Sequence, residues 1–341
     1  MRNNGINLKN FADFLNEMSK TIGMKMSARG WAYALEDVMI PQVGEVTKAD
    51  FDYIENLINK CRKLGYIPVD FVAQEEARGF DGVEEPTDEP PVLYLKKYLD
   101  ASLRSAEIYT PDWWDGETYY IQMVVEKIDL KSLFQPICED YHIPIATSKG
   151  WSSIYQRAEY ARRFKMAEED GLKCVLLYCG DHDPDGLRIS EFLRNNLEQI
   201  SSIYWSDEMT GYTPNSLIID RFGLNYDFII DNNLTWIENL ITGSKRNLAS
   251  PSHKNHHMPY VQEYLRTVGV RKCEANALVK KQDKGKQLCL ESILKYLGED
   301  AEQRFENKRQ KIRDEVNDFF KRTKLDETIQ KSLDIINKEF G

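Results

Sequence analysis

The chain has 341 residues, 42% of them hydrophobic and 11% aromatic, which is enough apolar material for two domains and too much for a disordered chain. No apolar run approaches the roughly 20 residues that span a bilayer, and the N-terminal residues lack the apolar stretch of a signal peptide. The six cysteines include no Cys-x-x-Cys pair, a pattern that favours reduced thiols over disulfides or a zinc site. We therefore expect a soluble cytoplasmic protein without a membrane partner.

The formal net charge of −10 argues mildly against nucleic-acid binding, because phosphate contacts need Lys and Arg. The distribution of charge qualifies this argument, since residues 243–287 carry ten Lys or Arg and only three acids. Such a stretch predicts either a basic DNA-binding face or an ordinary solvated surface. On the first interpretation, the residues expected to contact DNA include Lys245, Arg246, Lys254, Arg271 and Lys272.

The first 79 residues have the pattern of a small helical domain. Apolar residues at helical spacing predict helices over 10–22 and 28–38. Thr47 and Asp50 have the spacing of a capping box, which predicts a third helix over 48–64. The following residues, 66–72, favour extended chain. Three helices followed by an extended segment indicate a winged-helix DNA-binding domain at 1–79.

The remainder of the chain begins with a linker and continues as alternating strands and helices. Residues 80–118 contain an acidic, proline-rich linker and a helix near 92–108. Alternating strands and helices within 119–285 predict a parallel sheet flanked by helices, and the pattern of 286–341 predicts a helical extension that ends in one long helix over 302–340. The predicted strands are 119–125, 144–147, 173–179 and 216–219, and the predicted helices between them are 130–141, 151–169 and 186–200.

Acidic residues gather where two of these strands end. Asp181, Asp183 and Asp185 lie within five positions after the third strand, and Glu126 directly follows the first. Because the carboxyl ends of parallel strands meet at one edge of a sheet, we expect these side chains to converge. Oxygen ligands at this density suit a hard divalent cation, Mg²⁺ or alternatively Mn²⁺, and without a cation the carboxylates would repel one another. The sequence therefore predicts a metal site for phosphate chemistry.

Some neighbouring residues have a structural interpretation beside the functional one. Asp185 precedes Gly186, so it either supports the metal ligands or caps the next helix. His182 points to the opposite face of an extended chain from its two neighbours, which favours packing over metal ligation. Lys149 follows the second predicted strand and is either a DNA contact or a solvated loop lysine.

The order of these motifs resembles a known family. A strand-ending Glu126, followed after some 50 residues by Asp181-x-Asp183-Pro184-x-Gly186, resembles the Toprim domain of topoisomerases and related nucleases. The proline and glycine are similar to the variant found in the DNA-cleaving subunit of topoisomerase VI and in the meiotic double-strand-break protein. Further similar segments bring the likeness to about 119–278, namely 141–145 leading into 149–153, 219–224, and Glu274-Ala275-Asn276-Ala277-Leu278.

The resemblance implies a function and a set of partners. Glu126, Asp181 and Asp183 would hold Mg²⁺ against a DNA phosphate, and Glu126 would also move a proton to or from the leaving oxygen. Asp185, Lys149 and Glu274 would support this site. The family further implies double-stranded DNA as substrate, a homodimer, an ATPase partner and a place in the nucleoid. The ATPase would be a separate chain, because no Walker A sequence occurs here.

The family also implies a covalent nucleophile. Its catalytic tyrosine follows an arginine by four positions, and Arg29 and Tyr33 keep that spacing, which is one helical turn. The guanidinium would hold a phosphate while the phenolate attacks it. Gly30 and Ala32 depart from the acid and the aromatic residue usual in the family, and a tyrosine on such a helix also suits core packing.

Three functions thus remain open from the sequence. The first is topoisomerase VI-like cleavage of DNA by Tyr33. The second is hydrolysis of DNA by water at the same metal site, as in Toprim nucleases of plasmid-defence systems. The third is a DNA-binding subunit without activity, which the intact set of acids disfavours because clustered unpaired charges destabilise a fold.

Overall fold

The computed structural model describes residues 7–41, 43–68, 71–73, 87–148, 154–203, 211–241 and 246–340. Contacts divide the chain into two compact units, each built from two separate stretches of sequence. The first unit is Met1–Arg78 with Thr118–Tyr296, and the second is Gly79–Glu117 with Leu297–Gly341. The predicted segments 1–79 and 119–285 therefore lie in one unit, while the linker and most of the C-terminal extension form the other.

A four-stranded parallel sheet forms the centre of the first unit, which confirms the predicted α/β architecture. Its strand order is β4-β3-β5-β6. All residues of the two central strands except the first are buried, as expected when helices cover both faces of a sheet. The strands are β3 (Tyr119–Val125), β4 (Ile145–Thr147), β5 (Lys173–Cys179) and β6 (Ile218–Gly223).

The two central strands end at the same level. The register pairs Tyr119 with Lys173 at one end and Val125 with Cys179 at the other. The residues that follow, Glu126 and Gly180, are therefore brought to the same edge of the sheet. Both strands have the bounds predicted from the sequence. The fourth was predicted too early, because β6 begins at Ile218 and continues to Gly223.

Helices cover opposite faces of the sheet because successive strand residues point in opposite directions. Met123 contacts Cys138 of α6 (Ile128–Asp140), while Tyr120 packs on Phe164 of α7 (Ile154–Glu169). The predicted helix over 186–200 is divided into the short helix η4 (Gly186–Arg188) and α8 (Ile189–Glu198). The remaining helices of this part are α9 (Tyr226–Asp231), α10 (Pro259–Thr267), η5 (Ala275–Lys281) and α11 (Gln282–Leu297).

The N-terminal segment is helical, with a short antiparallel strand pair. Its elements are α1 (Leu8–Ile22), α2 (Ala28–Ala34), β1 (Met39–Ile40), β2 (Gly44–Glu45), η1 (Lys48–Asp50) and α3 (Phe51–Lys63). The capping box is confirmed, since the Asp50 carboxylate accepts hydrogen bonds from the backbone and the hydroxyl of Thr47 at 2.9 and 2.8 Å.

Two predictions for this segment are wrong. The second helix ends at Ala34 rather than at 38, because the chain turns at Asp37, whose φ of 62° is left-handed, and enters β1. The described part of 66–72 (residues 66–68, 71 and 72) contains no strand. The extended pair instead precedes α3, where Met39 pairs with Glu45 and Ile40 with Gly44.

A buried carboxylate fixes α2 against α6. Asp129, in the first turn of α6, accepts hydrogen bonds from the backbone N–H of Ser27 and, at 2.6 Å, from the Ser27 hydroxyl. The same hydroxyl accepts from the N–H of Gly30 and so caps α2. A Cβ at Gly30 would lie 2.6 Å from an Asp129 carboxylate oxygen, so only glycine allows this close approach.

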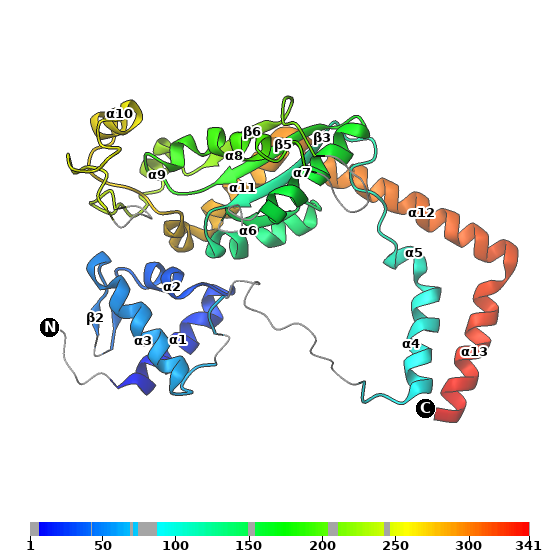
Figure 1. Cartoon of the computed structure of the whole chain (residues 1–341). Helices are drawn as coiled ribbons and strands as arrows, with labels where there is room; N and C mark the ends of the chain where they lie inside the picture. Colours follow the sequence, from blue (N-terminus) through cyan, green and yellow to red (C-terminus); the bar gives the residue numbers. More distant parts are fainter. Residues whose placement is uncertain are drawn as a thin grey trace. The chain divides into compact units, whose positions relative to one another are not determined.

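The second unit consists of helices from its two separate stretches of sequence. It contains α4 (Pro91–Leu103), α5 (Ser105–Ile108), α12 (Ala301–Thr323) and α13 (Leu325–Phe340). α4 lies beside α13, and α5 lies beside α12 (Figure 1). Arg304 of α12 also pairs at 2.6 Å with Glu117, which follows α5 in the sequence. The single final helix predicted over 302–340 is wrong, because Lys324 takes a left-handed φ of 58° and separates α12 from α13.

Within the described ranges, none of the helices combines the length and the apolar character needed to cross a membrane.

Gly30→Ala tests the contact between α2 and α6. The added methyl group overlaps the Asp129 carboxylate, and we expect the free energy of unfolding to fall by about 1–3 kcal/mol. Urea unfolding followed by tryptophan fluorescence measures this, since Trp31 is buried in α2.

A double-mutant cycle identifies the cause. In an Asp129→Ala background the clash is absent, so Gly30→Ala should change the stability by less than about 0.5 kcal/mol. Equal losses in the two backgrounds would contradict this contact.

Candidate functional site

The candidate site lies at the ends of β3 and β5. The Glu126 side chain turns toward the loop after β5, where one of its oxygens accepts the backbone N–H of Asp181 at 2.7 Å. The hydroxyl of Tyr178 donates to the same oxygen at 3.3 Å. A Cβ at Gly180 would lie 2.3 Å from that hydroxyl and 2.7 Å from the Glu126 oxygen, so the residue that follows β5 must be glycine.

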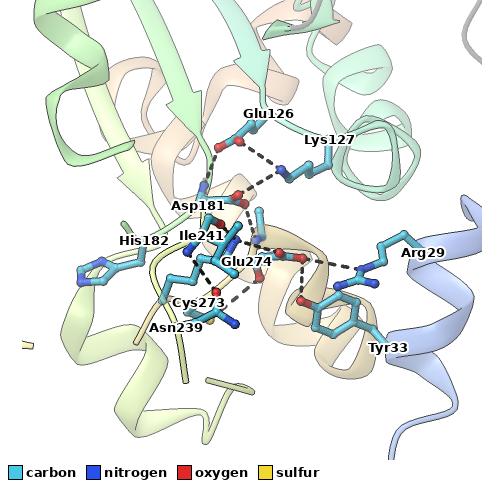
Figure 2. Close-up of polar contacts among 12 residues, drawn as sticks. Arg29, Tyr33, Glu126, Lys127, Asp181, His182, Asn239, Ile241, Cys273 and Glu274 are labelled. Atoms are coloured by element: carbon cyan, nitrogen blue, oxygen red, sulfur yellow. Dashed lines mark hydrogen bonds and ion pairs between the residues drawn. The ribbon is translucent and has the colours of Figure 1, made fainter. Parts of the chain in front are cut away.

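Lys127 holds the two central carboxylates together. Its ammonium nitrogen lies 3.0 Å from one Glu126 oxygen and 2.9 Å from one Asp181 oxygen, and Figure 2 shows it between them. This residue was not among those predicted from the sequence. The sequence does place a lysine directly after the acid that ends β3. A lysine at this position can reach both carboxylates with its flexible side chain.

Asp181 joins the sheet edge to a distant part of the sequence. Its other carboxylate oxygen accepts the backbone N–H of Ala275 at 2.8 Å, which places the start of η5 beside the site. Arg221 of β6 fixes the acidic turn itself, because its guanidinium donates to the backbone carbonyls of Asp181 at 3.0 Å and Gly186 at 3.1 Å. The segments 219–224 and 274–278 thus both donate hydrogen bonds that hold the turn at 180–186.

Asp183 rather than Asp185 caps the helix that follows. The Asp183 carboxylate accepts the N–H of Gly186 at 2.6 Å. Asp185 makes no capping bond, and the capping alternative for it is wrong. Its carboxylate instead accepts the hydroxyl of Tyr260 at 3.1 Å. The turn places Asp183 at the N-terminal side of η4, where its oxygen satisfies a backbone donor that Asp185 does not reach.

The carboxylates differ in their electrostatics. Burial raises the pKa of Glu126, but the charge of Lys127 and the N–H of Asp181 outweigh burial and leave that pKa lowered. Burial, followed by the charge of Glu126, raises the pKa of Asp181 to about 8. Burial also raises the pKa of Asp183 to about 6, against the hydrogen bond from Gly186. A metal that takes Glu126 and Asp181 as ligands must displace the Lys127 ammonium from both.

The donor chemistry fits a hard cation, but the present arrangement is closed around Lys127. Within the described ranges, no three His, Cys, Asp or Glu side chains are arranged to hold a metal ion together. Glu126 and Asp181 already share one cation, the Lys127 ammonium, through one oxygen each. A divalent ion would compete for these same two oxygens, and Asp183 lies in the pocket beside them.

Tyr33 and Arg29 lie near the carboxylates, but their polar groups bind other residues. Tyr33 is fully buried, and its hydroxyl donates to Glu274 at 2.8 Å (Figure 2). Burial and the Glu274 charge raise the pKa of Tyr33. The Arg29 guanidinium pairs with Asp52 at 3.0 Å and Glu55 at 2.9 Å, and lies 3.8 Å from Glu274.

The predicted basic residues do not form one surface group. Lys272 is buried, where its ammonium contacts Glu274 at 3.1 Å and the carbonyl of Ile241 at 2.7 Å. Arg271 lies over the ring of Trp236 at 4.2 Å. The exposed members among the described residues are Arg246 and Lys254. Lys245 and Lys149 lie outside the described residues.

His182 packs as predicted. It is buried, and Figure 2 shows it pointing away from the carboxylates. One ring nitrogen contacts the carbonyl of Leu224 at 3.0 Å, and the ring packs near Trp236 and Tyr264. His182 therefore packs on the side of the acidic turn that faces away from the carboxylates.

A pocket of about 560 Å³ opens beside the carboxylates. Glu126, Asp183 and Asp185 contribute its acidic side. The segment around His253 and α8 contribute the other walls, with basic and aromatic side chains. This volume lies within the range of pockets that bind small ligands.

Comparison of the chain with protein-family models, with curated proteins and with solved structures found no significant match.

Lys127→Met tests whether Lys127 and a metal compete. In the variant, Glu126 and Asp181 lack their counter-charge, so a divalent ion gains two ligands without displacing an ammonium. We expect Mn²⁺ to bind about tenfold more tightly than to the original protein, as titrated by electron paramagnetic resonance.

The matched control is Lys173→Met, because Lys173 is exposed at the opposite end of β5. This change should leave the Mn²⁺ affinity as it is. Weaker binding by Lys127→Met than by the control would show that Lys127 organises the ligands rather than competing with the metal.

Proposed function

We propose that residues 119–285 are a Toprim-like domain, preceded by a winged-helix-like segment, and that the protein cleaves DNA with a divalent metal. The observation that carries this proposal is the placement of Glu126 and Asp181 at the ends of adjacent parallel strands in matching register. Asp183 follows two positions later and lines the same pocket. The order of the acids along the chain is the one on which the resemblance found in the sequence rests.

The residues of the site have distinct roles in this reaction. Glu126, Asp181 and Asp183 would hold Mg²⁺ or Mn²⁺, which when bound offsets the charge that develops on the phosphate and the leaving oxygen. Lys127, displaced from its two carboxylates, would add a positive charge beside the metal. Arg221 keeps the turn in place through its backbone contacts, so the carboxylates need not reorganise during the reaction.

The environment of Tyr33 favours water as the attacking group. A nucleophilic tyrosine must be exposed and must lose its proton readily. Tyr33 is buried, donates to Glu274, and has a raised pKa. Its arginine partner is already paired with Asp52 and Glu55. We therefore place hydrolysis ahead of covalent cleavage.

Covalent cleavage remains the second candidate because Tyr33 lies close to the metal ligands. Its partner Glu274 directly precedes Ala275, whose N–H binds Asp181. Release of the Glu274 contact would open a path from Tyr33 to the site. The homodimer and the ATPase partner belong to this second route and stay predictions, as does the inactive DNA-binding role.

Plasmid cleavage in Mg²⁺ separates the three functions. Asp183→Asn keeps the oxygen that accepts from Gly186 but removes a charge, and we expect it to lower the cleavage rate by about 100-fold or more. Tyr33→Phe should keep the rate within about threefold, since it removes only a hydroxyl hydrogen bond away from the attacking water. Gel analysis before and after protease treatment should show no protein joined to the DNA ends.

Asp231→Asn and Tyr109→Phe are the matched controls, because both residues are exposed outside the site. Loss of cleavage in Tyr33→Phe together with protein-linked ends would establish the covalent route. Equal activity of Asp183→Asn and Asp231→Asn would refute a metal-dependent reaction at these acids.

A further inference from the structure

The pocket beside the carboxylates contains more than a metal site requires. Besides the acids, α8 contributes Phe192 to the lining of the pocket, and the N-terminal part of α10 contributes Tyr260. Phe192 is 46% exposed, so it is not a core residue, although it lines a pocket. The Arg188 guanidinium lies 4.6 Å from the ring centre of Tyr260 and 5.7 Å from that of Phe192. These groups form a partly exposed set of flat surfaces.

Of Phe192 and Tyr260, which we call the aromatic wall, Tyr260 is hydrogen-bonded to the acidic turn. The Tyr260 hydroxyl donates to Asp185, which lies two residues after Asp183. Arg188 in turn pairs with Glu191 at 2.6 Å, one residue before Phe192. A base that stacks on Tyr260 would therefore lie near Asp185.

The same pocket offers hydrogen-bond donors suited to a phosphate. His253 is buried with 7% exposure, and its Nδ1 accepts the backbone N–H of Asn255 at 3.1 Å. In the neutral imidazole the proton therefore sits on Nε2, which makes that nitrogen a donor. Lys254, the next residue, is exposed and also lines the pocket. A phosphate beside this pair would lie in the same pocket as the acids.

From this juxtaposition we propose that the pocket is a subsite for one unpaired nucleotide of a DNA strand. Its base stacks on Phe192 and Tyr260, and its phosphate contacts His253 and Lys254. The inference deepens the proposed function and rests on it for the choice of DNA.

The shape of the wall selects an unpaired nucleotide. Stacking requires the face of a base, and within a duplex both faces are covered by neighbouring base pairs. A pocket of about 560 Å³ is of the size that encloses a small ligand rather than a double helix. DNA with a gap, a flap or a frayed end would therefore present its strand to the acids more readily than intact duplex.

Fluorescence of a 2-aminopurine oligonucleotide tests this subsite directly. Binding is measured in EDTA in an Asp183→Asn background, so that no strand is cut. The probe is supplied as a single strand, as the same strand in a duplex, and as the free monophosphate. We expect the single strand to bind most tightly, with fluorescence quenched by stacking on the aromatic wall.

Phe192→Ala should weaken binding of the single strand about tenfold and relieve the quenching, with less than a twofold change for the duplex. Lys254→Ala should weaken binding and reduce the slope of log affinity against log salt by about one. Phe319→Ala and Lys338→Ala are the controls, because Phe319 is similarly exposed at 44% on α12 and Lys338 is exposed on α13.

Equal losses in Phe192→Ala and Phe319→Ala, or equal losses for strand and duplex, would overturn the subsite. Binding of the free monophosphate without the strand would also overturn it, since the pocket would then serve a small ligand. The separate plasmid assay keeps the two proposals apart. Cleavage that does not depend on Phe192 leaves the metal-dependent reaction standing, and Phe192-dependent strand binding without any cleavage refutes only that reaction.

Discussion

The ion pairs of Lys127 with Glu126 and Asp181 are the interaction on which the site depends. The parallel sheet brings the half-buried Glu126 and the buried Asp181 to one edge, at 2.7 Å between a Glu126 oxygen and the Asp181 backbone nitrogen. Two such charges in a buried setting need a counter-charge, because their repulsion and desolvation would otherwise destabilise the fold. Lys127 supplies that charge from the residue next to Glu126. Lys127 therefore balances the charge of the two carboxylates, whose oxygens are the kind of ligand that a hard metal ion prefers.

The groups around this pair form a connected network. Ala275 binds Asp181, and its neighbour Glu274 holds Tyr33 and Lys272. Displacement of Lys127 by a metal would thus be felt by residues that lie far apart in the sequence. Within this network the Tyr33 hydroxyl is a structural hydrogen-bond donor to Glu274.

The sheet was predictable because its signals are local. Each central strand is a short apolar run with clear ends, and the bounds of β3 and β5 follow from the sequence alone. The clustering of Glu126 with the acidic turn followed from parallel strands ending at one edge. Errors arose where a single backbone conformation decides the outcome, as at Lys324, whose left-handed conformation divides a helix that is continuous in its charge and apolar pattern.

Side-chain partners were less predictable because they depend on contacts across the fold. No sequence pattern shows that Asp183 rather than Asp185 reaches the N–H of Gly186, or that Lys272 is buried against Glu274. The contact of Lys127 with Glu126 is the most predictable of these side-chain contacts, because the two residues are adjacent in the sequence. The aromatic wall combines Phe192 of α8 with Tyr260 of α10. These residues are far apart in the sequence, and only the folded chain brings them into one pocket with the acids.

The most direct test of this account is a crystal structure of the protein soaked in Mn²⁺, with anomalous scattering used to locate the ion. The account predicts an anomalous peak bound by Glu126 and Asp181, with Asp183 beside it and the Lys127 ammonium moved away from both carboxylates. Lys127 still bridging Glu126 and Asp181, with no peak at the ends of β3 and β5, would contradict it.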